Sequence, residues 1–408
     1  HSYLGLGSMI EGQYPSAIPL CTIPRQLTNR QAVTGGLANS EEESFSWCNA
    51  LGEEKQTLPR ILAHYGYATM LWVGPYLQRE AHADSLESLE SQFQAAWTSP
   101  PEWSLAADSL EEPLLDWWDS NPDQPRFALV AADLRALSSD RILTELTRVD
   151  RPDSLTQEEY AQAAGFQEQI YAAYTQAAAS AGARVKALLS SLESHRGDRP
   201  LVVYVTSAGG LSLGEASGTP SLPRHPVFQE ILLERTTHVP LLIFEIDSTA
   251  TEGQEHTHPV ELLDITPTVL ARAGAIPLVD AAGDDLAAEA LSPPADSSAY
   301  SEFGDMLSVR VGSHFLMARM WMHGGTSLNP EITDRLREGH LPQASFTLHD
   351  VLLDPLQAQD LLETDPDSAE RLKAVLLNIR EGAGAVNLGD FSTDEVDLLM
   401  RQRTDGYW

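Results

Sequence analysis

Short apolar runs recur along the first two thirds of the chain, and each has the length of a buried strand. They are Ala68–Gly74, Phe127–Ala132, Leu201–Val205 and Val239–Ile246. Segments with a helical spacing of apolar positions lie around them, at Thr57–His64, Gln157–His195 and Glu261–Ala273, and we expect the alanine-rich second one to break near Gly182. Strands and helices that alternate in this way predict an α/β fold, in which helices cover both faces of a mostly parallel sheet.

The rest of the pattern is less regular. Residues 83–123 are acidic with scattered Trp and Leu, and predict only short helices and loops. Residues 280–298 are rich in Ala, Asp and Ser, which is typical of a linker. Beyond it we expect a hairpin at Leu307–Arg310 and His314–Met322, a strand at Phe346–Leu352 and a helix at Ala369–Arg380. The predicted organisation is thus an α/β domain over residues 1–279 and a small α+β domain over 299–408.

The charge of the chain is strongly negative. Its 26 basic and 59 acidic side chains give a formal net charge of -33, which excludes nucleic acid and anionic membrane surfaces as favourable partners. No apolar run approaches the roughly 18 residues of a membrane span, so we expect none in this chain. Two cysteines, Cys21 and Cys48, allow either one disulfide or two buried thiols.

The most informative loop follows the third apolar run. It reads Ser207-Ala208-Gly209-Gly210-Leu211-Ser212-Leu213-Gly214-Glu215, a polar segment at a strand end, where α/β enzymes place their chemistry. It resembles the metal loop of the sulfatase family, Ser-Asp-His-Gly-Glu-x-Leu-Gly-Glu-His, at Ser207, Gly210, Leu213, Gly214 and Glu215. The metal-binding Asp and His of that pattern correspond to Ala208 and Gly209.

Further segments resemble the same family in the same order. They are Thr57–Thr69, Glu234 with Val239–Leu242, Pro259–Thr268 and Thr347–Pro355, so the likeness extends over most of the chain. It implies the alkaline-phosphatase-like architecture: a large α/β domain and a smaller C-terminal domain with an antiparallel sheet. It also implies hydrolysis of sulfate esters and an exported protein, periplasmic or extracellular, of bacterial type.

The family nucleophile lies in a Cys/Ser-x-Pro-x-Arg motif, and Cys21-Thr22-Ile23-Pro24-Arg25 is close to its place. Here the spacing departs by one residue, because two residues separate Cys21 from Pro24 and Arg25 follows directly. The candidate catalytic residues are therefore Cys21, Thr22 and Arg25, with Thr28 as another hydroxyl and His225 as a displaced basic group. The alternative interpretation makes Cys21 a buried structural cysteine.

Several family positions have lost their metal-binding residues. Ala208 and Gly209 have no side-chain donor, and Asp133-Leu134-Arg135 stands where the family places histidines. The family's strand with paired Asp residues would precede His1, and we expect it to be either lost or cut off. A divalent cation held by oxygen atoms needs such donors. The sequence therefore predicts a degenerate sulfatase homologue with no metal or other cofactor, which acts as a binding or structural member of a protein assembly.

Two other hypotheses remain at this level. In one, a missing N-terminal segment completes an active metal-dependent hydrolase of sulfate or phosphate esters, with Ca²⁺ as the cofactor. In the other, the cleft binds a sulfated or neutral glycan, with Trp103 and Trp117-Trp118 as stacking platform or as core. The Glu255, His256 and His258 cluster is interpreted as a solvated loop in preference to a zinc site, because no third ligand has fitting spacing. The sequence leaves the oligomeric state open.

Overall fold

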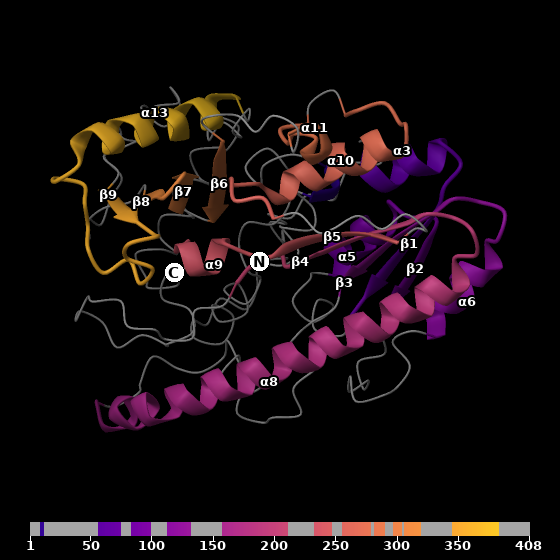
Figure 1. Cartoon of the computed structure of the whole chain (residues 1–408), viewed down its shortest axis with the longest axis horizontal. Coiled ribbons are helices and arrows are strands. Elements are labelled where there is room, and N and C mark those ends of the chain that lie inside the picture. The colour runs from indigo at the N-terminus through magenta and orange to yellow at the C-terminus, as the bar shows by residue number, and fades with distance from the viewer. Residues whose placement is uncertain are drawn as a thin grey trace, which may run out of the picture.

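The computed structural model describes residues 9–11, 56–74, 83–98, 112–131, 157–210, 232–246, 255–278, 281–289, 297–303, 306–319 and 345–382 of the 408. Strands lie at the centre of the larger part of the molecule, with the helices α3, α10 and α11 on one side and the long helix α8 on the other (Figure 1). A separate four-stranded sheet with its own helix, α13, forms the other end of the molecule. The predicted α/β fold with a further antiparallel sheet is confirmed.

The first sheet is parallel and has β1 at its centre. Strand β1 (Ala68–Val73) pairs with β2 (Ala95–Thr98) on one side and with β3 (Arg126–Ala131) on the other. All six residues of β1 are buried, as its continuous apolar run predicted, and Trp72 stacks on Trp97 of β2 with ring centroids 5.4 Å apart. Strand β2 was not predicted, because four residues are too few to show a period within an acidic region.

Helices α3 (Leu58–His64) and α10 (Ile265–Arg272) cover one face of this sheet. Leu58 and Leu62 pack with Leu270 in a buried cluster that also contacts Phe127 of β3. The 3-10 helix η3 (Leu262–Asp264) leads directly into α10, so the predicted helix begins with a tighter turn. Helix α5 (Ala83–Glu90) contributes Leu89 to a further cluster with Leu71.

Helix α8 (Gln157–His195) runs unbroken through Gly182, against the prediction of a break there. A side-chain atom at Gly182 would meet no neighbour within 4 Å, so this glycine is not required by any close contact. Leu192 packs with Trp118 of α6 (Glu112–Ser120) and with Leu201 of β4. The C-terminal end of α8 thus packs against α6 and β4, on the side of the strands opposite α3 and α10 (Figure 1).

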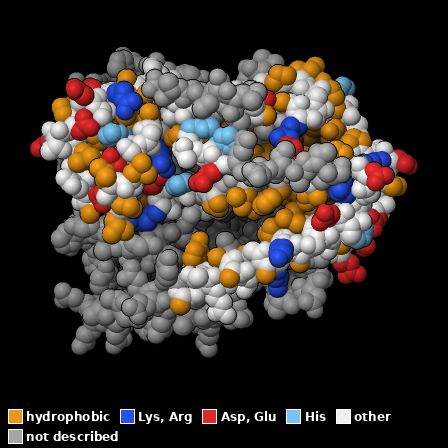
Figure 2. All heavy atoms as spheres, in the orientation of Figure 1, with side chains coloured by type: hydrophobic (Ala, Val, Ile, Leu, Met, Phe, Trp, Pro, Cys, Tyr) orange, Lys and Arg blue, Asp and Glu red, His pale blue; other side chains and the backbone are white. Residues whose placement is uncertain are grey.

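Strands β4 (Leu201–Thr206) and β5 (Leu241–Ile246) differ from the expected parallel arrangement. They pair antiparallel, and among the described strands they form a sheet of two. The described part of their connection contains α9 (Glu234–Thr237). Three adjacent side chains of β5 are partly exposed: Leu242, Ile243 and Phe244. Figure 2 shows hydrophobic side chains at the surface over β4 and β5, with a hollow between them and α8.

The C-terminal sheet is antiparallel in the order β6 (Ser298–Phe303), β7 (Met306–Val311), β8 (His314–Arg319) and β9 (Ser345–Asp350). Helix α13 (Pro366–Gly382) packs Leu372 and Leu376 against Val309 and Leu316. The hairpin, the third strand and the helix were predicted. Strand β6 was not predicted; it begins at Ser298, the last residue of the expected linker.

The expected linker is held to the α/β part at several points. It contains α11 (Leu286–Glu289), and the backbone N–H groups of Asp284 and Leu286 donate to the side chains of Asp264 and Thr268, at 2.8 and 2.9 Å. The domain boundaries proposed from composition stay a prediction. None of the described helices is both long enough and apolar enough to cross a membrane.

Candidate functional site

The loop after β4 is folded back on itself by Ser207. The Ser207 hydroxyl donates to the Gly209 carbonyl oxygen at 2.7 Å and also lies 3.4 Å from the Gly209 nitrogen, as an acceptor. The side chains of Ala208 and Gly209 contain no oxygen or nitrogen. The described part of the loop, Ser207 to Gly210, therefore presents one hydroxyl group and main-chain atoms.

Gly210 lies directly against the short helix α9. Its N–H donates to the Thr236 carbonyl oxygen at 2.8 Å. A Cβ atom at this position would lie 2.5 Å from the Arg235 carbonyl oxygen and 3.0 Å from the Thr236 Cα. Only glycine fits here without a shift of the backbone, because Cβ atoms do not approach backbone oxygens so closely. The Gly210 match to the sulfatase pattern thus has a packing reason.

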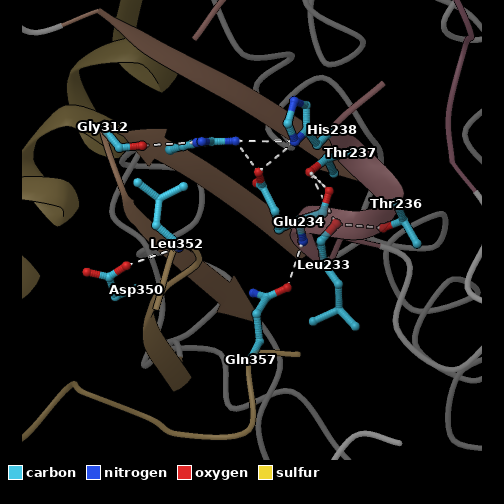
Figure 3. Close-up of polar contacts among 10 residues, drawn as sticks. Leu233, Glu234, Thr236, Thr237, His238, Gly312, Asp350, Leu352 and Gln357 are labelled. Carbon is cyan, nitrogen blue, oxygen red and sulfur yellow. Dashed lines mark hydrogen bonds and ion pairs between the residues drawn. The ribbon is translucent and has the colours of Figure 1, made fainter. Parts of the chain in front are cut away.

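Helix α9 is in turn held by three contacts around Glu234 (Figure 3). The Arg310 guanidinium of β7 forms an ion pair and hydrogen bond with Glu234 Oε1. His238 Nδ1 lies 3.1 Å from the same oxygen, and the Glu234 N–H donates to the Gln357 side-chain oxygen at 2.8 Å. Together these residues join the loop after β4 to the C-terminal sheet through α9.

The Glu234–Arg310 pair is largely removed from water, since the two side chains are 11% and 17% exposed. Burial raises the pKa of the Glu234 carboxyl above its ordinary value, whereas Arg310 and then His238 act in the opposite direction through charge and hydrogen bonds. A carboxylate engaged in this way is a structural anion, with Arg310 as its counter-ion. It is not available as a ligand for a cation at the neighbouring loop.

The described residues of the loop do not fit a hard divalent cation. Such an ion takes roughly six to eight oxygen ligands, commonly from carboxylates. From Ser207 to Gly210, only Ser207 has a side-chain oxygen, and its hydroxyl donates a hydrogen bond to the Gly209 carbonyl oxygen. Throughout the ranges that the structure describes, no three His, Cys, Asp or Glu side chains gather as possible metal ligands.

The candidate catalytic residues from the sequence, Cys21, Thr22, Arg25, Thr28 and His225, lie outside the described residues, as does Trp103. Their roles stay predictions.

The other candidates from the sequence can be placed. Trp118 is only 8% exposed and packs with Leu192 and Leu201, so it belongs to the core and is not a platform for a glycan. The rings of His256 and His258 meet edge to face with centroids 5.8 Å apart.

Sequence reasoning singled out Glu234 but missed its partners Arg310 and Gln357. Glu234 and Arg310 are 76 positions apart, and Glu234 and Gln357 are 123 apart. No periodicity within one sequence links residues at such separations. A weaker signal was present in the sequence. Arg310 is an isolated charge within the apolar β7, and a buried charge is usually paired with one of opposite sign.

Comparison with known proteins agrees with this architecture. Residues 20–275 match the family model described as Sulfatase. Three solved structures share the fold at low sequence identity: the putative sulfatase yidJ from Bacteroides fragilis, a sulfatase of glycosaminoglycan metabolism from Bacteroides thetaiotaomicron, and the phosphonate monoester hydrolase SpPMH from Silicibacter pomeroyi.

Their TM-scores are 0.61, 0.58 and 0.55 at 12%, 14% and 14% identity. The matches cover 96%, 95% and 94% of this chain and 88%, 86% and 86% of the three others. None of the curated protein sequences matches the chain. The family match covers more than half of the 408 residues, and on that ground the chain belongs to the sulfatase family.

Proposed function

We propose that this chain is a non-catalytic member of the sulfatase family, which acts by binding or as a structural component of an assembly. The observation that supports it is the loop after β4. The resemblance assigns its two metal-ligand positions to Ala208 and Gly209, and neither side chain has a donor atom. The backbone frame of the loop is nevertheless kept, since Gly210 is packed against α9.

The proposal rests on the energetics of the family reaction. Hydrolysis of a sulfate ester places negative charge on oxygen atoms, and a bound cation stabilises that charge. Ser207 to Gly210 contain no carboxylate, so this part of the loop cannot compensate the dehydration of such an ion. A loop that keeps its backbone packing but lacks its metal ligands is expected in a protein that still needs the fold and no longer catalyses the family reaction.

A protein partner is favoured over a sulfated glycan. Relatives that act in glycosaminoglycan metabolism suggest a sulfated glycan as the ligand class. However, the chain has a net charge of -33, which repels a polyanion at long range. Burial of Trp118 also removes one of the aromatic platforms that a glycan would need. We further propose export from the cell, in line with the family resemblance.

The test combines metal analysis with enzyme assays on the purified full chain. After incubation with Ca²⁺, Mg²⁺, Mn²⁺ or Zn²⁺ and exhaustive dialysis, we expect metal far below one ion per chain. We also expect no turnover of aryl sulfates, aryl phosphates or phosphonate monoesters above a heat-denatured control. A stoichiometric ion together with turnover would overturn the proposal and favour a metal-dependent hydrolase of sulfate or phosphate esters, the activity that the alternative hypothesis assigns to a chain completed by an N-terminal segment.

A further inference from the structure

The turn after β9 displays three leucines to solvent. Leu352 is 69% exposed, Leu353 is 86% exposed and Leu356 is 50% exposed. We call this segment, residues 350–357, the leucine turn. Single exposed leucines are common on protein surfaces, but three within five positions form a local apolar surface.

The turn is held in one conformation by hydrogen bonds within it. One oxygen of the Asp350 side chain accepts the backbone N–H groups of Leu352 and Leu353, both at 3.0 Å. The Asp354 N–H donates to the Asp350 carbonyl oxygen at 2.7 Å. Burial raises the pKa of Asp350, but these N–H groups, with Ser313 and His314, lower it below its ordinary value in total. The exposed leucines thus stand on an ordered turn.

Both ends of the turn are attached to the rest of the fold. At its start, Asp350 is the last residue of β9, and Val351 donates its N–H to the Ser313 carbonyl oxygen at 2.9 Å. At its end, Gln357 is 8% exposed, adopts a φ of 52°, and accepts the Glu234 N–H (Figure 3). A non-glycine residue in this region of backbone space is held there by its surroundings.

An ordered turn with exposed leucines has the properties of a binding surface. Contact with a partner would remove the leucine side chains from water, which stabilises a complex by roughly 25 cal/mol per Å² of apolar area. Because the turn is already ordered, binding loses little conformational entropy. In the free protein none of the three leucines belongs to a buried hydrophobic cluster of the described residues.

The charge around the turn defines the kind of partner. Residues 350–369 contain no Lys or Arg, and they contain six carboxylates: Asp350, Asp354, Asp360, Glu363, Asp365 and Asp367. At this end of the molecule, hydrophobic side chains lie at the surface among acidic, basic and histidine side chains (Figure 2), so the acidic character is that of the segment 350–369 itself. A complementary surface has an apolar pocket with a basic border.

We propose that the leucine turn docks into an apolar pocket, bordered by Lys and Arg, on a different protein. A second copy of this chain is disfavoured, since two chains with a net charge of -33 each repel one another. An anionic membrane is disfavoured for the same reason. This inference goes beyond the proposed function, because it names a surface and the chemistry of its partner and holds whether or not the chain is catalytic.

The experiment selects peptides from a random display library on the wild-type full chain. Peptides that also bind the Leu352→Ser/Leu353→Ser variant are removed at each round. We expect the remaining peptides to combine aliphatic or aromatic residues with Lys and Arg. Their affinity should fall by about tenfold or more in the variant, the loss typical of hot-spot side chains. It should also fall with added salt, because charge contributes to binding.

Ile276→Ser is the matched control, because Ile276 is 68% exposed in the segment after α10, far along the chain from the turn. It should bind the selected peptides like the wild type. The proposal is overturned if no peptides are enriched, if the enriched peptides are acidic or uncharged, or if both variants lose binding equally. It is also overturned if the Leu352→Ser/Leu353→Ser change abolishes dimers in light scattering, or binding to phosphatidylserine vesicles, since a second copy or a membrane would then be the partner.

Discussion

Arg310 on β7 is ion-paired with Glu234 on α9. The C-terminal sheet therefore contacts the same helix against which the loop after β4 packs. The pair lies between parts of the chain that are distant in sequence, and both side chains are largely buried. Because Gly210 and Glu234 belong to the same small unit, the position of the loop depends on the C-terminal sheet. This relationship leads to the first two predictions.

Arg310→Met should strongly destabilise the protein. The substitution leaves the Glu234 carboxylate buried without its counter-ion, which typically costs about 3–5 kcal/mol of the free energy of unfolding. The measurement is urea unfolding followed by tryptophan fluorescence. The double variant Glu234→Gln/Arg310→Met should be less destabilised than Arg310→Met alone, because no charge is then left buried.

Arg272→Met is the control for this prediction. Arg272 also forms an ion pair, with Glu245, but these side chains are 34% and 52% exposed. An exposed pair contributes only about 0–1 kcal/mol. Equal effects of the two arginine substitutions would contradict the view that burial gives the Glu234–Arg310 pair its importance.

Gly210→Ala and Gly209→Ala should differ although they are neighbours. A methyl group at 210 would clash with the backbone of α9, whereas one at 209 would lie 4.0 Å from the Thr236 carbonyl oxygen. We expect Gly210→Ala to cost about 1–3 kcal/mol, as overpacked sites do, and Gly209→Ala to have little effect. Differential scanning calorimetry of both variants measures this, and equal melting temperatures would argue against the tight contact.

The strands and helices of this fold were predictable where the signal is local. β1 is a continuous apolar run and is fully buried, and α13 shows its apolar face in the sequence. β2 is too short for a period, and β6, Ser-Ala-Tyr-Ser-Glu-Phe, has no regular alternation of polar and apolar residues and follows a low-complexity segment. Gly182 lowers helix propensity, but the rest of α8 outweighs it.

The candidate site was predictable in part. The loop of Ser207 to Gly210 was located because its frame is a sequence motif. The contacts that hold α9 under this loop could not be predicted, because the tertiary fold brings Glu234 together with Arg310 and Gln357. The antiparallel pairing of β4 with β5 was missed for a related reason: an apolar run predicts a strand but does not give its direction.

The stability contributed by the Asp365 charge should depend on pH. Asp365 precedes α13 and accepts the Ser368 N–H at 3.2 Å, and His314 Nε2 lies 3.3 Å from its carboxylate. The hydroxyl and N–H of Ser368 lower the pKa of Asp365, as His314 also does. A lowered pKa in the folded state stabilises the protein above the unfolded value of about 3.9, and this stabilisation is lost as the pH falls through the folded value.

Asp365→Asn tests this dependence, because asparagine still caps a helix but has no charge. The melting temperature of the wild type should exceed that of the variant at neutral pH, and the difference should shrink as the pH is lowered below about 4. A difference that stays constant on acidification would show that ionisation of Asp365 does not contribute. Lys373→Met, which removes an exposed ion pair within α13, provides a comparison in the same helix.

Returning the two family ligands to the loop should not restore a metal site. In Ala208→Asp/Gly209→His the new side chain at 209 has room, since its Cβ would lie 4.0 Å from the nearest neighbour outside the adjacent residues. We expect the variant to fold and its melting temperature to be unchanged by Ca²⁺ at about 1 mM, because one carboxylate and one imidazole fall short of the oxygen ligands that Ca²⁺ requires.

Ala208→Asn/Gly209→Gln is the control of similar shape without the carboxylate. A rise in melting temperature with Ca²⁺ in the first variant alone would mean that the ion binds the folded state, with stabilisation following RT ln(1 + [Ca²⁺]/Kd). The remaining ligands would then still be in place, and the loss of the site would be confined to Ala208 and Gly209.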